Sequence, residues 1–169
     1  MFQMISNTEP KRRVVLGLGN ILNRDEGLGI QALQLLDTQL GDHPDLELLD
    51  GGVLGLNLLM IVEECSHLLI LDAVNARKPA GTLIELVKKD IPLFAGIKLS
   101  EHQVTFQEVL GLASIRGFLP ENLYIIGLQP DDLSIGLGVS PIIEKMLPQV
   151  VNKAIEKLTA WGLISQNGD

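Results

Sequence analysis

The sequence predicts an α/β protein: a three-layer αβα sandwich built on a mainly parallel five-stranded sheet with one antiparallel strand. Three observations support this prediction. Short apolar runs alternate with segments of helical periodicity, which is the pattern of a parallel sheet covered by helices. Several of these runs are apolar at almost every position, as expected for strands buried on both faces. Glycines and acidic residues gather where the runs end, and α/β proteins bind ligands at the carboxyl ends of strands.

Five segments have the composition of β-strands. Residues 13–19 are typical, because apolar residues fill nearly every position before Gly19. The fourth segment follows the third after a short connection without a helix, so we expect it to run antiparallel beside the third. The predicted strands are residues 13–19, 46–49, 68–71, 81–88 and 123–128.

Four segments show the apolar periodicity of helices. Asp25 is expected to be the N-cap or a first-turn acid of the first helix, which ends near Gly41. Pro141 suits the first turn of the last helix, and Pro148 is expected to kink or divide that helix. The predicted helices cover about 28–40, 56–65, 103–117 and 141–161, and the third has its entrance at 100–103.

The composition describes a folded, acidic protein. Its 169 residues suffice for one domain with its own core, and we predict a single domain over 1–169 with flexible ends at 1–11 and 164–169. The net charge of −8 argues against nucleic acid or an anionic membrane surface as partner. The single Cys65 excludes an intrachain disulfide and a thiolate-rich metal site. No apolar run is long enough to span a membrane, and a cytoplasmic location is expected.

The stretch from residue 14 to residue 29 organises the chain, because a strand there breaks at glycines and leads two adjacent acids into a helix. Gly17 and Gly19 begin a dinucleotide-binding pattern, but Leu22 stands where its third glycine would be. A phosphate-binding loop with Lys and Ser or Thr is also absent. Carboxylates repel phosphate and attract cations, so we interpret the stretch as half of a cation site. A nucleotide- or flavin-binding domain is the alternative, and the missing glycine counts against it.

Glu26, Asp72 and His102 share one geometric property: each is predicted where the chain leaves a strand or enters a helix. If the first and third strands are neighbours, as in the common 2-1-3 order, Glu26 and Asp72 meet at one edge of the sheet. His102 would have to be brought there by its loop. Two carboxylates and one imidazole suit a divalent transition metal with open positions for substrate, without selecting among zinc, nickel and cobalt.

Each of these residues also has an ordinary structural interpretation. Glu26 could complement the helix dipole, and Asp72 could cap the end of its strand. His102 could simply neighbour a helix cap. Asp50 begins an Asp-Gly-Gly sequence that is common in turns, yet it would reach the same edge of the sheet.

These residues together resemble the [NiFe]-hydrogenase maturation endopeptidases, and the resemblance covers roughly residues 14–158. The long first motif is fairly specific and the ordered set of motifs is highly specific. Val53 and Glu101 stand where many relatives have Thr and Pro. The motifs are Gly17-x-Gly19-Asn20-x-Leu22-x-x-Asp25-Glu26-x-x-Gly29, Leu49-Asp50-Gly51-Gly52 with Gly55, Asp72-Ala73, and Ser100-x-His102-Gln103.

The resemblance implies a cytoplasmic protease that removes the C-terminal extension of the hydrogenase large-subunit precursor after nickel insertion. The metal-binding residues of the family match Glu26, Asp72 and His102, and its conserved acid matches Asp50. Nickel would arrive with the precursor and serve recognition, and no organic cofactor is expected. Gly51, Gly52 and Gln103 are the expected substrate-binding residues.

The sequence offers no conventional protease machinery. It contains no G-x-S-x-G elbow, no H-E-x-x-H helix and no credible Ser–His or Cys–His pair. The remaining nucleophile is an activated water molecule, with Asp72 or Asp50 as its general base and Glu26 assisting. The choice between the two bases stays open. We also expect an apolar groove at the same edge, to which the connection 91–99 would contribute. A non-catalytic nickel-binding maturation chaperone is the alternative function.

Overall fold

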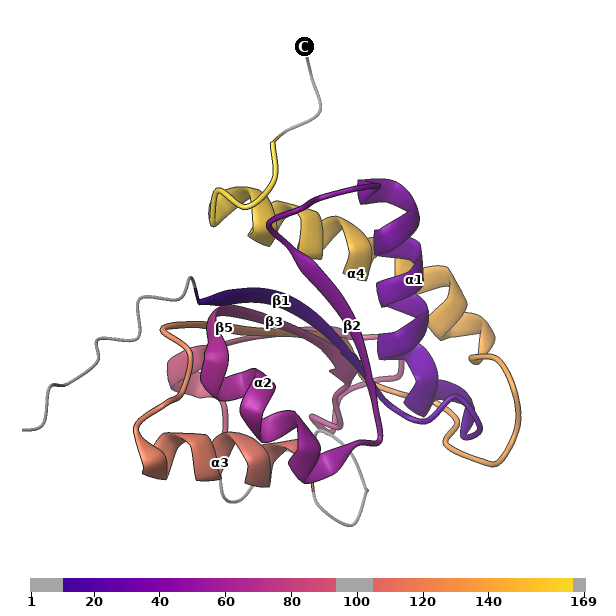
Figure 1. The fold of residues 1–169 in the computed structure, drawn as a ribbon. Helices are drawn as coiled ribbons and strands as arrows, with labels where there is room; N and C mark the ends of the chain where they lie inside the picture. Colours follow the sequence, from indigo (N-terminus) through magenta and orange to yellow (C-terminus); the bar gives the residue numbers. More distant parts are fainter. Residues whose placement is uncertain (1–10, 94–104, 166–169) are drawn as a thin grey trace, which may run out of the picture.

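The computed structural model describes residues 11–93 and 105–165. A central five-stranded sheet has the order β2-β1-β3-β5-β4, in which β4 alone is antiparallel. Helices α1 and α4 cover one face, and α2 and α3 cover the other (Figure 1). This confirms the predicted three-layer αβα sandwich. The elements are β1 (Arg12–Leu18), α1 (Leu28–Leu40), β2 (Glu47–Gly52), α2 (Leu59–Glu64), β3 (Cys65–Ala73), β4 (Leu83–Val87), α3 (Phe106–Arg116), β5 (Asn122–Leu128) and α4 (Pro141–Ala160), with the 3-10 turns η1 (Arg24–Gly27), η2 (Gly55–Leu58) and η3 (Lys88–Asp90).

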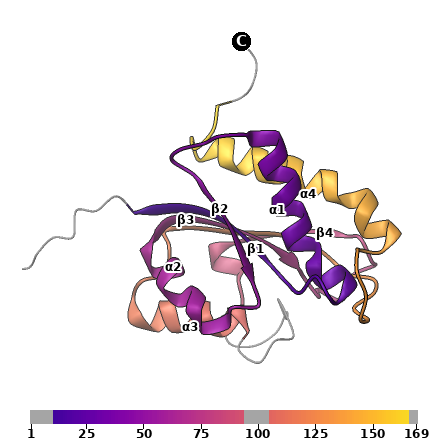
Figure 2. The same cartoon turned by 45° about the vertical axis from the view of Figure 1, so that its right-hand side comes forward.

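The sheet separates two apolar cores, because successive residues of a strand point to opposite faces. Val14 and Leu16 of β1 pack in the layer of α2 and α3, whereas Val15 packs in the layer of α1 and α4. The central strands β1, β3 and β5 are therefore apolar at consecutive positions. Figure 2, turned from the first view, shows the pair α1 and α4 lying along the sheet on one side.

The predicted neighbourhood of the first three strands is confirmed: β1 lies between β2 and β3, and both pairs are parallel. The expectation for the fourth strand was half right. β4 runs antiparallel, but it pairs with β5 and not with β3. The two sides of β3 are occupied by β1 and β5, which leaves an edge position for β4. Alternately exposed residues in β4 suit that edge.

Several element boundaries differ from the predictions. The predicted helix 56–65 begins as the turn η2 and ends at Glu64, because Cys65 already pairs with Arg12 as the first residue of β3. β2 continues to Gly52, so Asp50-Gly51-Gly52 belongs to a strand end and not to a separate turn. Pro148 does not divide α4, which runs without interruption from Pro141. Pro148 is exposed, so water can reach the backbone carbonyl that its missing N–H leaves without a donor.

The first helix confirms its predicted C-terminus, since Gly41 takes a positive φ of 64° directly after Leu40. Most of the terminal residues predicted to be flexible, 1–10 and 166–169, lie outside the described residues. None of the helices in the described part of the chain combines the length and apolar composition needed to cross a membrane.

Candidate functional site

The carboxyl ends of β1, β2 and β3 place the predicted site residues at one edge of the sheet. Gly17 near the end of β1 pairs with Asp50 on one side and with Leu71 on the other. Asp72 follows Leu71 directly, and η1, which carries Glu26, contacts β3. The edge predicted from the strand order is therefore the edge where these acids lie.

Two glycines allow the turn with Glu26 to lie this close to the sheet. Gly19 has φ +127°, and a Cβ atom there would lie 1.6 Å from the backbone oxygen of Glu26. A Cβ atom on Gly29, in the first turn of α1, would lie 2.2 Å from the oxygen of Leu71 and 2.4 Å from that of Leu18. Both glycines are required because backbone atoms occupy the space of a side chain. The start of α1 is thereby pressed against the ends of β1 and β3.

Glu26 and Asp72 are both buried, with 7% and 1% of their surfaces exposed. Oδ1 of Asp72 accepts a hydrogen bond of 2.8 Å from the backbone N–H of Ala73, and Oδ2 accepts none from the residues that the structure describes. Burial holds the pKa of Asp72 well above its ordinary value of 3.8; the bond from Ala73 lowers it, and the negative charge of Glu26 raises it further. The structure thus brings together two of the predicted metal ligands in a buried, electrostatically unfavourable pair.

Asp50 is exposed at the same edge. Its Oδ1 accepts a hydrogen bond of 2.9 Å from the N–H of Gly52, which fixes the carboxylate at the strand end. Because β1 lies between β2 and β3, the backbones of Asp50 and Asp72 are about 10 Å apart, two strand spacings. At this separation the two acids cannot share a proton directly.

The other predicted residues have different placements. His102 and Gln103 lie outside the described residues. Gly51 is buried against Leu16 and Leu18, while the backbone oxygen of Gly52 accepts a hydrogen bond of 3.1 Å from the N–H of Gly19. Within residues 11–93 and 105–165, no three His, Cys, Asp or Glu side chains form a group that could hold a metal ion.

Cys65 is buried in the core, as predicted for a residue that is not a nucleophile. Its side chain is 2% exposed and belongs to the cluster between the sheet and the layer of α2 and α3. Burial raises the pKa of its thiol to about 12. The thiolate that a cysteine protease would need is therefore not available.

Asp25 was predicted as the N-cap or a first-turn acid of the first helix, but it is neither in α1, because it lies in the preceding 3-10 turn η1. The N-cap of α1 is Gly27, and the fully buried carboxylate of Asp25 instead binds the segment between β5 and α4. Its Oδ2 accepts hydrogen bonds from the backbone N–H groups of Asp131 (2.9 Å) and Asp132 (2.8 Å). The hydroxyl (2.8 Å, to Oδ2) and the N–H (2.6 Å, to Oδ1) of Ser140 complete the set. The backbone of Asp131 and Asp132 is thus bound to the turn that carries Glu26.

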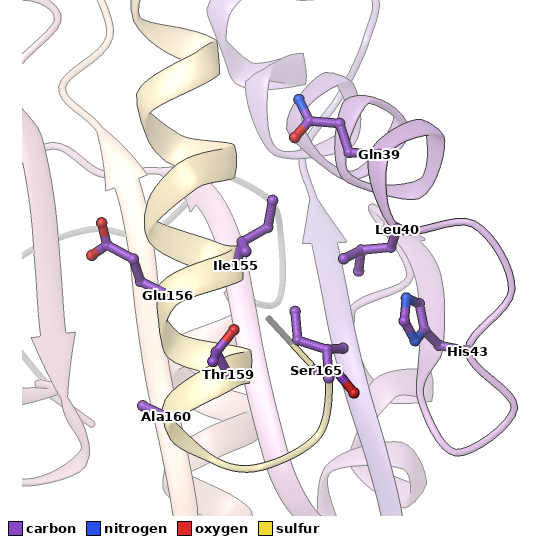
Figure 3. Close-up of a pocket in the computed structure, with 9 residues that line it drawn as sticks. Gln39, Leu40, His43, Ile155, Glu156, Thr159, Ala160 and Ser165 are labelled. Carbon is purple, nitrogen blue, oxygen red and sulfur yellow. The ribbon is translucent and has the colours of Figure 1, made fainter. Parts of the chain in front are cut away.

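A pocket of about 610 Å³ lies between the C-terminal ends of α1 and α4 (Figure 3). Leu40 and His43 border it on one side, and Ile155 and Thr159 of α4 on the other. The residues of η1 stand at the opposite end of α1, which is about 20 Å long. This pocket is therefore separate from the site formed by Glu26 and Asp72.

The sequence and the architecture match those of known proteins. The family model "Hydrogenase maturation protease" matches residues 30–157, more than half of the chain. The chain is 36% identical to the hydrogenase expression/formation protein HupD of Rhodobacter capsulatus over 157 residues, which cover 92% of this chain and 75% of that protein. It is 32% identical to the hydrogenase 2 maturation protease of Escherichia coli K12 over 153 residues, which cover 90% and 93% of the two chains.

A solved structure gives the same result at the level of the fold. The hydrogenase maturating endopeptidase HybD from E. coli superposes with a TM-score of 0.81 at 30% identity, covering 89% of this chain and 94% of that one. The strand order, the close approach of α1 to the sheet and these similarities lead to one conclusion. The chain belongs to the hydrogenase maturation protease family and is a peptidase of that family.

Proposed function

We propose that this peptidase removes a C-terminal extension from the precursor of a [NiFe]-hydrogenase large subunit after nickel insertion, and that it recognises the nickel carried by the precursor. The observation that carries the proposal is the buried pair of Glu26 and Asp72 at the carboxyl edge of the sheet. The relatives, which are named for hydrogenase expression/formation and for hydrogenase maturation, support the class of substrate.

The acid pair has the chemistry of a cation site. Two buried carboxylates repel each other and lose hydration, and a divalent cation between them would remove the repulsion. Oδ2 of Asp72 is buried and accepts no hydrogen bond from the described residues, so it can accept a metal ion. His102 would supply the third ligand. Two oxygen donors and one nitrogen donor would leave coordination positions open for the groups that already hold nickel in the precursor.

Asp50 and Asp72 are the two candidates for the general base. Asp50 is exposed at the strand end, with its carboxylate oriented by the N–H of Gly52. A separation of about 10 Å between the backbones of the two acids leaves room for an extended peptide and a water molecule. Either acid could take the proton of that water as it attacks the peptide carbonyl. Metal held by the precursor would polarise the water or the carbonyl.

The precursor is a folded protein and needs a surface on which to dock. Loops after β1, β2 and β5 surround the site and expose large apolar side chains, although Ile91 of the expected groove is buried. Because the carboxyl ends of parallel strands meet at one edge, these side chains would face the same partner. They are Ile21, Leu22, Val53, Leu54, Leu56, Leu133, Ile135 and Leu137.

Incubation of the purified chain with nickel-loaded precursor tests the proposal. Mass spectrometry should detect loss of the C-terminal segment, and nickel-free precursor should stay intact. Stable binding without shortening would identify a maturation chaperone and defeat the protease proposal. Cleavage of the nickel-free precursor at the same rate would defeat nickel recognition alone.

Three variants distinguish binding of the precursor from its cleavage. Asp72→Asn is expected to lose both precursor binding and cleavage. Asp50→Asn should still bind the nickel-loaded precursor, and a fall in cleavage of about 10²-fold or more would identify Asp50 as the base. Normal cleavage by this variant would assign the base to Asp72. Asp42→Asn, in the exposed loop after α1, is the control and should behave as wild type.

A further inference from the structure

Asp25 is a buried acid that the proposed chemistry does not use. All four of its side-chain hydrogen bonds come from the segment between β5 and α4, at 2.6–2.9 Å. Three are backbone N–H groups and one is the hydroxyl of Ser140, so donors occupy both oxygens. A carboxylate satisfied in this way needs no cation. Asp25 therefore differs from Asp72, although both are buried at the same edge.

The backbone of the turn is bound to the same segment. The N–H of Arg24 donates to the oxygen of Gly136 (3.0 Å), and the N–H of Asp25 donates to the oxygen of Asp132 (3.0 Å). Gly136 in turn donates to the oxygen of Leu22 (2.8 Å). The two bonds of Gly136 form an isolated parallel bridge between Asn23 and Gly136, and the bond from Asp25 to Asp132 adds a further contact between the two segments.

Arg24 has a left-handed backbone conformation, with φ 42°. Residues other than glycine adopt this conformation at a cost, and they keep it only where the surroundings hold them. The backbone bonds of Arg24 and Asp25 and the carboxylate of Asp25 supply that restraint. Glu26 is the next residue of the same 3-10 turn, so its direction depends on the restraint.

We infer that Asp25 is a positioning residue for the candidate site. By fastening the turn Arg24–Gly27 to residues 131–140, it holds Glu26 beside Asp72. The role of Glu26 in this inference rests on the proposed function, whereas the restraint of the turn by Asp25 does not depend on it. Residues that orient metal ligands typically change metal affinity by about 10–100-fold when they are replaced.

Asp25→Asn is the direct test, because Asn has the same shape but turns one acceptor into an N–H donor. Either orientation of the amide points that donor at a donor of the loop. Ser140→Ala removes only the hydroxyl bond and leaves Asp25 in place. Leu158→Ala is the control for lost stability: it opens a cavity in the buried core, about 27 Å along α4 from Ser140.

Two measurements decide the outcome. In Asp25→Asn, amide hydrogen exchange is expected to speed up at residues 24–27 while the sheet stays protected, and unchanged exchange in the turn would overturn the inference. Calorimetric titration with Ni²⁺ alone should show affinity at least about tenfold weaker. Leu158→Ala should bind Ni²⁺ with the affinity of wild type. An equal loss of Ni²⁺ affinity in Leu158→Ala would mean that Asp25 acts only through stability, and it would overturn the inference.

Two other results are possible: no binding of free Ni²⁺ by wild type, and failure of Asp25→Asn to fold. If wild type binds no free Ni²⁺, calorimetry does not test recognition of nickel carried by the precursor, and amide exchange alone decides the inference about Asp25. If Asp25→Asn does not fold, Ser140→Ala decides it, with a smaller change expected in the same direction. No change in either measurement for Ser140→Ala would then count against the inference.

Discussion

Replacement of Gly29 by alanine gives a sensitive test of how the site is built. In the interior of a helix this change normally stabilises, because alanine has the higher helix propensity by about 1 kcal/mol. The added Cβ would lie 2.2 Å from the oxygen of Leu71 and 2.4 Å from the oxygen of Leu18. Both oxygens belong to the backbone of the central sheet and cannot rotate away. The helix α1 must therefore withdraw by about 1 Å to reach the 3.4 Å at which ordinary contact begins.

Two effects of measurable size follow from this displacement. Overpacking of this kind typically costs about 1–3 kcal/mol, so we expect Gly29→Ala to lose about 2 kcal/mol or more of unfolding free energy in spite of its higher helix propensity. Glu26 precedes the helix by one turn and would move with it. A displacement of about 1 Å in a catalytic arrangement can lower the rate about 10²-fold, which is the loss expected in precursor cleavage.

Urea unfolding followed by circular dichroism measures the first effect, and precursor cleavage the second. Gly41→Ala is the control: its Cβ meets open space, and only the backbone conformation (φ 64°, ψ −149°), which is nearly confined to glycine, opposes it, at a cost of about 1–3 kcal/mol. It should leave cleavage at the wild-type rate. A Gly29→Ala protein that is as stable and as active as wild type would refute the argument that backbone contact sets the position of Glu26.

Three further changes test other parts of the structure. Asp72→Asn keeps the acceptor for the N–H of Ala73 and removes a carboxyl whose folded-state pKa lies above 3.8. Wild type should therefore lose stability relative to the variant as pH rises above that value. A difference in unfolding free energy between the two proteins that is the same at pH 4 and pH 7 would contradict this. Cys65, whose pKa is about 12, should react with iodoacetamide at pH 8 only after denaturation, and the reagent should leave cleavage unchanged. Thr105→Ala removes a capping box at the start of α3 and should cost about 1 kcal/mol in urea unfolding, whereas Thr38→Ala at an exposed position in the last turn of α1 should not destabilise.

The central position of β1 and β3 could be predicted because it follows from burial. Both strands are apolar at consecutive positions, which requires helices on both faces and neighbouring strands on both edges. The predicted order of the first three strands rests on the common 2-1-3 arrangement, and with it Glu26 and Asp72 are expected at one edge of the sheet. The position of β4 could not be predicted in this way. A half-exposed strand can occupy either edge of a sheet, and its pairing with β5 depends on a crossover that the local pattern does not describe.

The extent of β2 and the partner of Asp25 were missed for a different reason. Asp50-Gly51-Gly52 has the composition of a turn, but pairing of Asp50 with Gly17 and of Gly52 with Leu18 keeps these residues in the sheet. Asp25 and Ser140 are 115 residues apart, and no local signal connects a first-turn acid with a serine at the start of another helix. Tertiary contacts decided both cases over local propensity.

Asp25 and Asp72 show how a structural acid differs from a site acid when both are buried. Each follows an apolar strand, and from the sequence alone either could be a ligand. Asp25 accepts four hydrogen bonds, which compensate for its burial without any ligand. Among the residues that the structure describes, only the N–H of Ala73 donates a hydrogen bond to Asp72, which also lies near the negative charge of Glu26. A cation would relieve the second arrangement and would gain nothing at the first, so cation binding at this edge is expected on the side of Asp72.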